Sequence, residues 1–185
     1  SAGPYAVQLI VVSDAGCRDT VTQNITIWAL PPADAGVNDE ICDGEQATLT
    51  ASGGTQYLWS PGGMTTATIT VNPNVTTPYT VVVTDANGCS AQDAASVIVN
   101  PLPVPDAGTN QSICLGDNAT LSCTGGATYD WTPGNLSGAS ISVSPNATTT
   151  YTVLVTTSAG CQATTQVTVN VNPIPVADFA NSGNI

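Results

Sequence analysis

The chain has 185 residues, with no His, one basic residue (Arg18) and 13 acidic residues, which give a formal net charge of −12 at pH 7. Nucleic acids and anionic membrane surfaces attract proteins through clustered Lys and Arg, so this balance argues against both as partners. Apolar residues nevertheless make up 42% of the chain, which is enough for packed cores and argues against disorder.

The periodic stretches are rich in Thr and Val and are separated by Gly and Pro, which favours β-strands and turns. No helical periodicity and no apolar run of 18 or more residues is present. Six Cys in a Thr-rich chain without Lys predict disulfides and an extracytoplasmic setting, with free buried thiols as the alternative. We therefore expect an all-β, extracellular protein.

Strand signals follow one another at short spacing, with turn residues between them, as in a β-sandwich. Residues 46–52 alternate, with Ala47, Leu49 and Ala51 on one face. Asp85-Ala86-Asn87-Gly88 predicts a hairpin turn in which Asn-Gly supplies positive φ. We expect antiparallel sheets. The predicted strands of this part of the chain are residues 46–52, 57–59, 67–71, 79–84 and 94–99.

An internal repeat with a period of 72 residues organises the chain. Roughly half of the aligned positions are identical, without a gap, which defines two whole repeats at residues 32–103 and 104–175. The Pro-rich joints 101–103 and 173–175 predict short, stiff spacers. Clear matches are Asp34-Ala35-Gly36 with Asp106-Ala107-Gly108, Tyr57 and Trp59 with Tyr129 and Trp131, Tyr79-Thr80-Val81 with Tyr151-Thr152-Val153, and Gly88-Cys89 with Gly160-Cys161.

Both ends of the chain match parts of a repeat. Pro4-Tyr5-Ala6-Val7 followed by Gly16-Cys17 corresponds to Pro78-Tyr79-Thr80-Val81 followed by Gly88-Cys89. We interpret residues 1–31 as the C-terminal strands of a truncated domain and residues 176–185 as the start of a further one. The chain is then a segment of an array of domains arranged end to end.

Gly44 to Ala51, Trp59 and Tyr79 to Val83 give the repeats a resemblance to bacterial immunoglobulin-like domains. More narrowly, they resemble the Ig-like and PKD-like repeats of large Bacteroidota cell-surface proteins of the adhesin, gliding-motility or filament type. Residues 16–20 and Ala177-Asp178-Phe179 resemble parts of PKD-like domains. The resemblance implies tandem Ig-like/PKD-like β-sandwich domains at the cell surface, with neighbouring domains, and copies of the chain in a fibre, as partners.

The resemblance also implies roles for the repeated aromatic residues. Trp59 and Trp131 occupy the strand on which an Ig-like sandwich buries its core aromatic, so we expect core residues rather than platforms for sugars. Tyr79 and Tyr151 resemble the tyrosine-corner position, which again predicts core residues.

The usual inter-sheet disulfide of antibody domains is absent from both repeats. Val81 and Val153 occupy the position of its second Cys. Cys123 replaces Ala51, and we expect it to be a free buried thiol.

The remaining cysteines, Cys17, Cys42, Cys89, Cys114 and Cys161, are predicted to form disulfides. If the Ig strand order holds, Cys42 and Cys89 lie at opposite poles of one domain, because a seven-residue strand spans about 23 Å whereas a disulfide needs Cα atoms within about 7 Å. One hypothesis therefore pairs Cys42 with Cys161, between neighbouring domains. The other pairs Cys42 with Cys89 and Cys114 with Cys161, if the strand order differs.

Neither catalysis nor metal binding is supported. The acidic cluster Asp39, Glu40, Asp43 and Glu45 suggests paired carboxylates, but the second repeat has Gln111, Ser112, Leu115 and Asp117 instead. A Ser or Cys nucleophile has no His or Lys base. Asp34 and Asp106 leave an interdomain Ca²⁺ site as an alternative. We expect no enzyme, no cofactor and no metal.

We therefore expect a structural stalk or fibre segment. The alternatives are a carbohydrate- or protein-binding module and a passive spacer in a secreted multidomain enzyme.

Overall fold

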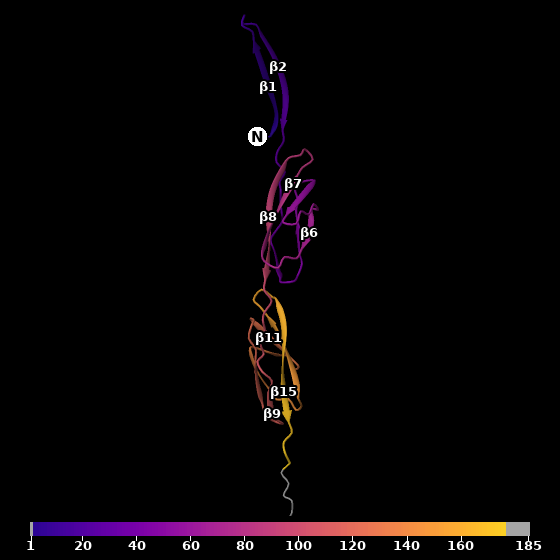
Figure 1. Ribbon diagram of the computed structural model, residues 1–185, viewed down its shortest axis with the longest axis vertical. Helices are drawn as coiled ribbons and strands as arrows, with labels where there is room; N and C mark the ends of the chain where they lie inside the picture. The colour runs from indigo at the N-terminus through magenta and orange to yellow at the C-terminus, as the bar shows by residue number, and fades with distance from the viewer. Residues whose placement is uncertain (1, 177–185) are drawn as a thin grey trace, which may run out of the picture. The chain divides into compact units, whose positions relative to one another are not determined.

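The computed structural model describes residues 2–176, which form β-strands and no helix (Figure 1). The all-β prediction is confirmed. The chain divides into two compact units between Val99 and Asn100, and each is described by itself. Apart from Val176, the predicted start of a further domain at residues 176–185 lies outside the described residues.

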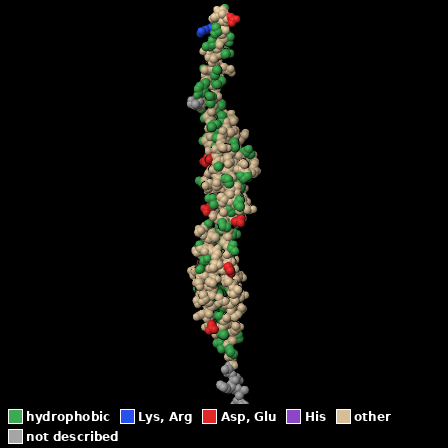
Figure 2. All heavy atoms as spheres, turned by 60° about the vertical axis from the view of Figure 1, so that its left-hand side comes forward, with side chains coloured by type: hydrophobic (Ala, Val, Ile, Leu, Met, Phe, Trp, Pro, Cys, Tyr) green, Lys and Arg blue, Asp and Glu red, His purple; other side chains and the backbone are tan. Residues whose placement is uncertain are grey.

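The first unit begins with a hairpin of two ten-residue strands, β1 (Gly3–Val12) and β2 (Arg18–Ile27). The strands pair antiparallel from Gly3 opposite Ile27 to Val12 opposite Arg18. Except for half-buried Gly3, every residue of the two strands is exposed, including Leu9, which is 60% exposed. Apolar side chains are therefore at the surface of this hairpin (Figure 2). A two-stranded hairpin is marginally stable by itself.

The same unit continues with the first repeat, which has strands on two sheets. One sheet has the order β3-β8-β7-β5, and the other pairs β4 with β6. The strands are β3 (Asp39–Cys42), β4 (Ala47–Thr50), β5 (Gln56–Ser60), β6 (Thr68–Val71), β7 (Thr77–Thr84) and β8 (Ser90–Asn100).

The second unit holds the second repeat, which has the same plan with one additional strand, β12. Its larger sheet has the order β12-β11-β14-β15-β9, and its smaller sheet pairs β10 with β13. The strands are β9 (Gln111–Cys114), β10 (Ala119–Ser122), β11 (Thr128–Thr132), β12 (Leu136–Ser137), β13 (Ser140–Val143), β14 (Thr149–Thr156) and β15 (Gln162–Asn172).

Alternation of side chains along the strands builds one apolar core in each repeat. In β7, Tyr79, Val81 and Val83 are buried while the residues between them are half-buried. The same rows of buried residues recur in the second repeat. Burying a Val or Leu side chain stabilises a fold by about 1.5–3 kcal/mol. Among the described residues no polar or charged residue is buried, so these cores contain no ionisable group except the thiol of Cys123 and the Tyr hydroxyls.

The prediction that all strands pair antiparallel was wrong for β9. Val169 to Asn172 of β15 lie beside Gln111 to Cys114 of β9 in parallel register. The chain passes from β9 to β10, which belongs to the other sheet, so no hairpin turn fixes the direction of β9 relative to its neighbour. No residue of this strand is buried, so its sequence shows no row of apolar core residues.

The hairpin turn between β7 and β8 also differs from the expectation. Gly88 has φ of 84°, but Asn87 is not among the residues with positive φ. Instead Asp85 accepts hydrogen bonds through Oδ1 from the backbone N–H groups of Asn87 and Cys89. The Asp side chain therefore shapes the turn, and only Gly needs the left-handed region.

Candidate functional site

The repeated Trp residues lie in the cores. Trp59 and Trp131 are both 0% exposed. The indole Nε1–H of Trp59 donates to the carbonyl of Thr66 at 3.1 Å, and that of Trp131 donates to the carbonyl of Gly138 at 2.9 Å. A buried indole with its only donor satisfied is unavailable for stacking on a sugar.

The repeated Tyr residues of β7 and β14 are core residues as well. Tyr79 and Tyr151 are each 6% exposed, and burial raises the pKa of the Tyr151 hydroxyl. Two residues further on, Val81 and Val153 are fully buried. Both side chains are therefore part of the packed cores and provide no reactive group.

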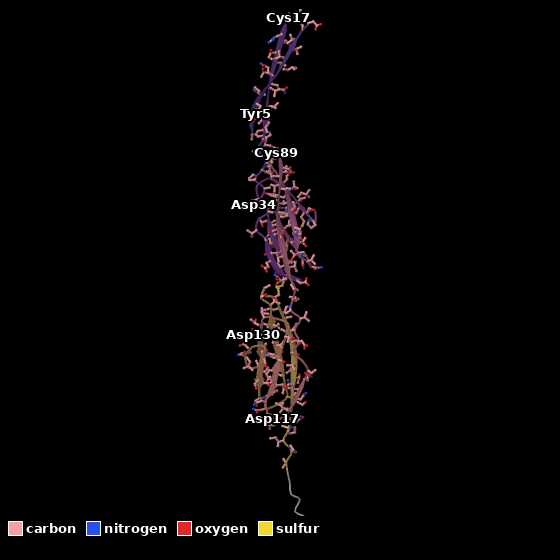
Figure 3. All side chains as sticks on the ribbon, turned by 90° about the vertical axis from the view of Figure 1, so that its left-hand side faces the viewer. Tyr5, Cys17, Asp34, Cys89, Asp117 and Asp130 are labelled. Atoms are coloured by element: carbon pink, nitrogen blue, oxygen red, sulfur yellow. The ribbon has the colours of Figure 1, made fainter. Side chains whose placement is uncertain are left out.

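The cysteines fall into two groups. Cys42 and Cys161 are disulfide-bonded, whereas Cys17, Cys89, Cys114 and Cys123 are free thiols. Cys17 follows the β1–β2 turn and Cys89 follows the β7–β8 turn (Figure 3).

Cys123 differs from the other free thiols in its burial. It is 2% exposed, while Cys17 and Cys114 are exposed and Cys89 is partly exposed. Burial raises the pKa of the Cys123 thiol and outweighs hydrogen bonds with the backbone of Asp106 and Thr124, which lower it, while the Asp106 carboxylate adds a smaller increase. The reactive thiolate is therefore disfavoured at this position.

The repeated Asp residues beside the joints organise turns. Asp34 accepts a hydrogen bond through Oδ1 from the N–H of Gly36, and Asp106 accepts the same bond from Gly108, both at 2.8 Å. Within residues 2–176 no group of three or more His, Cys, Asp or Glu side chains is placed to hold a metal ion.

The acidic cluster of the first repeat is tied to nearby backbone. Asp39 Oδ2 accepts from the N–H of Thr48 at 3.2 Å, and Glu45 Oε2 accepts from the N–H of Cys42 at 2.9 Å. In the second repeat Gln111, which replaces Asp39, donates from Nε2 to the carbonyl of Thr120. Asp39 and Gln111 thus each hydrogen-bond the backbone of the equivalent Thr, Asp39 as acceptor and Gln111 as donor. A carboxylate is therefore not required for this link between neighbouring strands.

A pocket of about 480 Å³ lies at one edge of the second repeat. Its lining comes from residues 127–130 and 137–139, around β11 and β12. Asp130 is the one carboxylate among the lining residues (Figure 3), and Tyr129 beside it donates its hydroxyl to the carbonyl of Gly126. A single carboxylate does not supply the acid and base pair that glycoside hydrolysis requires.

Comparison with known proteins agrees with this architecture. The family described as "Ig-like domain CHU_C associated" matches residues 102–173. The chain carries tandem Ig-like repeats. A search of curated proteins found no significant match.

Several solved structures are similar to the chain at low sequence identity. The titin I-band fragment I67–I69 is 14% identical, with a TM-score of 0.47, covering 79% of this chain and 67% of that one. Sidekick-1 immunoglobulin domains 1–5 are 14% identical, with a TM-score of 0.43, covering 92% of this chain and 46% of that one. The DIP-gamma IG1+IG2 structure is 13% identical, with a TM-score of 0.40, covering 76% of this chain and 98% of that one.

One side chain of the first Ig-like repeat has a role that the sequence did not reveal. Asp93 on β8 accepts a hydrogen bond through Oδ2 from the N–H of Ala35 at 2.8 Å. Hydrogen bonds from the backbone of Ala35 and Ala94 lower the pKa of this carboxyl. The second repeat has Thr165 at this position. The two bonded residues are 58 positions apart, so no local pattern connects them.

Among residues 2–176 there is no helical segment with the length and hydropathy that a membrane span needs.

Proposed function

We propose that this chain is a load-bearing segment of a large extracellular surface protein, serving as part of an adhesin stalk or a filament. The observation that carries the proposal is what the two Ig-like repeats share. They share their apolar cores, their Trp and Tyr anchors and their backbone ties. They do not share all of their carboxylates, because Asp39 and Asp93 are replaced by Gln111 and Thr165, and the shared Asp34 and Asp106 accept turn hydrogen bonds from the backbone. Repetition of the packed core without repetition of the acidic cluster Asp39, Glu40, Asp43 and Glu45 supports a mechanical role without catalysis.

An extracellular location is supported by covalent chemistry. Cys42 and Cys161 are disulfide-bonded, and disulfides persist in oxidising compartments. A net charge of −12 keeps an exposed protein soluble.

The partners that fit this function are other domains of the same kind. The β1–β2 hairpin matches β7–β8 in sequence but exposes the row that β7 buries, including Tyr5 and Val7. We interpret it as the end of a PKD-like domain, within the predicted boundaries 1–31, 32–103, 104–175 and 176–185. Copies of the chain in a fibre are further candidate partners.

Electron microscopy of the protein isolated from its natural source, labelled with an antibody against this chain, tests the proposal. We expect label along a fibre or stalk with a regular axial repeat. Label confined to a compact globular particle would refute the structural role.

A second candidate function, binding of a carbohydrate or a peptide, is favoured by the pocket beside Asp130. Leu58 stands at the corresponding position of the first repeat, so Asp130→Leu is a matched variant. Glycan and peptide arrays probed with both proteins decide this point. Binding that is lost in Asp130→Leu would favour recognition, whereas no binding by either protein favours the structural function.

A further inference from the structure

The β1–β2 hairpin has one apolar face and one polar face. Residues that pair directly across an antiparallel hairpin share a face, and successive residues of a strand alternate between faces. To the face opposite Leu9, β2 contributes only Thr, Asn and Arg side chains. The face that includes Leu9 holds seven large apolar side chains. They are Tyr5, Val7, Leu9 and Val11 of β1 and Val21, Ile25 and Ile27 of β2.

The apolar face of the hairpin has the pattern of a core strand. The β1–β2 turn and the β7–β8 turn have the same backbone hydrogen bonds. Counted from these turns, Leu9 and Val11 occupy the positions of Val81 and Val83. Val81 and Val83 are 0% exposed in a core that β4 and β6 also line, whereas Leu9 and Val11 are 60% and 58% exposed. The hairpin therefore presents a core face that lacks the second layer of a sandwich.

The exposed apolar area of this face is large enough for a protein interface. Each of its seven large apolar side chains is between 39% and 60% exposed. Together they expose on the order of 600 Å², which is the upper end for the largest apolar patch of a typical soluble monomer. Two such faces packed against each other bury about 1,200 Å², which reaches the range of stable and specific interfaces. A second copy of the hairpin therefore supplies enough area for a dimer.

The polar side chains on the apolar face suit a second copy whose strands run in the opposite direction. A twofold axis at the middle of the face then places β1 over β1 and β2 over β2 of the other copy. Gln23, which pairs with Val7 at this middle, meets the Gln23 of the other copy, and an amide group offers both a donor and an acceptor. Asp19 lies near the turn, so the two Asp19 carboxylates are about 26 Å apart along the strands. At this distance their repulsion is largely screened by salt.

We propose that two copies of the chain pair through the apolar faces of their β1–β2 hairpins, packed face to face with antiparallel strands. Each hairpin then supplies the second layer that the other lacks. The pairing deepens the proposed function by naming the surface through which copies meet, and it rests on that function only for its place in a fibre. A monomeric chain would refute the pairing without affecting the load-bearing role, which electron microscopy tests separately.

Two neighbouring residues of β1 allow a matched test of the face. Leu9 lies on the apolar face, and Ile10, which is 49% exposed, lies on the opposite one. Sedimentation equilibrium of the full chain, with reductant present to exclude disulfide-linked dimers, measures the dissociation constant. We expect a wild-type dimer that Leu9→Asp weakens by at least about a hundredfold, because the pairing buries the new carboxylate without a partner. Ile10→Asp should weaken it by about twofold or less, because residue 10 stays in water.

Three results of this measurement would overturn the proposal. A wild-type chain that stays monomeric would show that a different polypeptide segment covers the apolar face. A dimer that Leu9→Asp leaves intact would place the interface elsewhere, for example at the edges of the strands. Equal weakening by both variants would show that the dimer does not distinguish the two faces of the hairpin.

Cross-linking gives a result that does not depend on how the hairpin tolerates a charge. Val7→Cys keeps the face apolar, since a free Cys behaves as a small hydrophobic residue, and it places a thiol beside the twofold axis. A bismaleimide that spans about 10 Å, the distance between packed sheets, should join residue 7 of one copy to residue 7 of the other. Such a link between identical positions can only connect two chains, and peptide mass spectrometry identifies it.

Ala6→Cys is the matched control for the cross-link, because residue 6 lies on the opposite face of the same strand. Its thiols point away from the interface in both copies, so we expect a yield at least about tenfold lower, since packed sheets are about 10 Å apart and these thiols lie beyond both. Equal yields from Val7→Cys and Ala6→Cys would overturn the face-to-face arrangement.

Discussion

The two Ig-like repeats reach the same fold with different polar side chains, and the differences identify what the fold requires. Asp39 and Gln111 tie neighbouring strands with opposite hydrogen-bond polarity. Asp85 and Thr157 both accept the N–H of the Cys that follows the hairpin turn. The anchoring bonds of Trp59 and Trp131, by contrast, are alike. Core packing and turn geometry are thus fixed, while charge is interchangeable.

The largest expected effect is loss of a core Trp. Trp131→Ala should destabilise the second repeat by about 3–5 kcal/mol, because a fully buried ring leaves a cavity. Cys123 lies in the same core, so its alkylation rate under native conditions reports opening of that repeat. We expect this rate to rise by about two orders of magnitude or more.

Trp59→Ala is the matched control, since Trp59 belongs to the other core. It should destabilise the first repeat to a similar extent but change Cys123 alkylation much less. Equal exposure of Cys123 in both variants would show that the two cores do not open separately.

The next largest loss of stability is expected at a glycine whose surroundings leave no room for a Cβ atom. Gly125 has φ of +100°, and a Cβ there would lie 2.1 Å from the carbonyl oxygen of Val104. Gly160 has φ of +87° but no atom within 4 Å of such a Cβ. Gly160→Ala should cost about 1–2 kcal/mol for its left-handed backbone, and Gly125→Ala roughly a further 1–3 kcal/mol for the clash. Equal losses in urea unfolding would contradict the close packing at Gly125.

A smaller effect on stability, which depends on pH, is expected at Asp93 of the first repeat and not at the equivalent Thr165 of the second. The backbone N–H of Ala35, followed by that of Ala94, lowers the pKa of this carboxyl below the ordinary value of 3.8. A lowered pKa in the folded state adds stability above pH 3.8 that disappears as the pH falls through the folded-state pKa. Asp93→Asn should therefore lower the thermal midpoint at neutral pH, and the difference should shrink in acid.

Thr165→Ala at the equivalent position removes no carboxylate and serves as the control. Its effect on the midpoint should not change between neutral pH and acid. A constant difference for Asp93→Asn across this range would argue that the Ala35 bond contributes nothing to stability.

The smallest effect is expected where the repeats differ inside the core. Cys123→Ala installs the residue that the first repeat has at position 51 and should change the free energy of unfolding by less than about 1.5 kcal/mol. Urea unfolding measures it. A larger loss would show that the thiol fills space that the second repeat cannot close.

Much of the fold could be predicted because side-chain periodicity is local. The alternation in residues 46–52 and 79–84 places the buried rows correctly. The short strands β3 and β9 were missed. Only one residue of β3 and none of β9 is buried, so neither strand has the alternation that identified the equally short β4. The additional strand β12 was missed too. It follows Asn135, which takes φ of 51°, and the sequence around it contains only a turn signal.

The candidate site was predictable only to the extent that it repeats. Internal comparison identified the Cys positions and discounted the acidic cluster. The bond between Asp93 and Ala35 depends on two strands brought together by the fold, and nothing near either residue signals it. Likewise, the exchange of Asp39 for Gln111 reads as a loss of charge in the sequence, although the tie between strands remains.

The most direct test of the account pulls single molecules of the reduced chain from their ends. We predict a discrete unfolding event for each Ig-like repeat. Each event should lengthen the chain by on the order of 200 Å, because a 72-residue repeat extends at roughly 3.4 Å per residue. Gradual lengthening without discrete events would contradict load-bearing repeats.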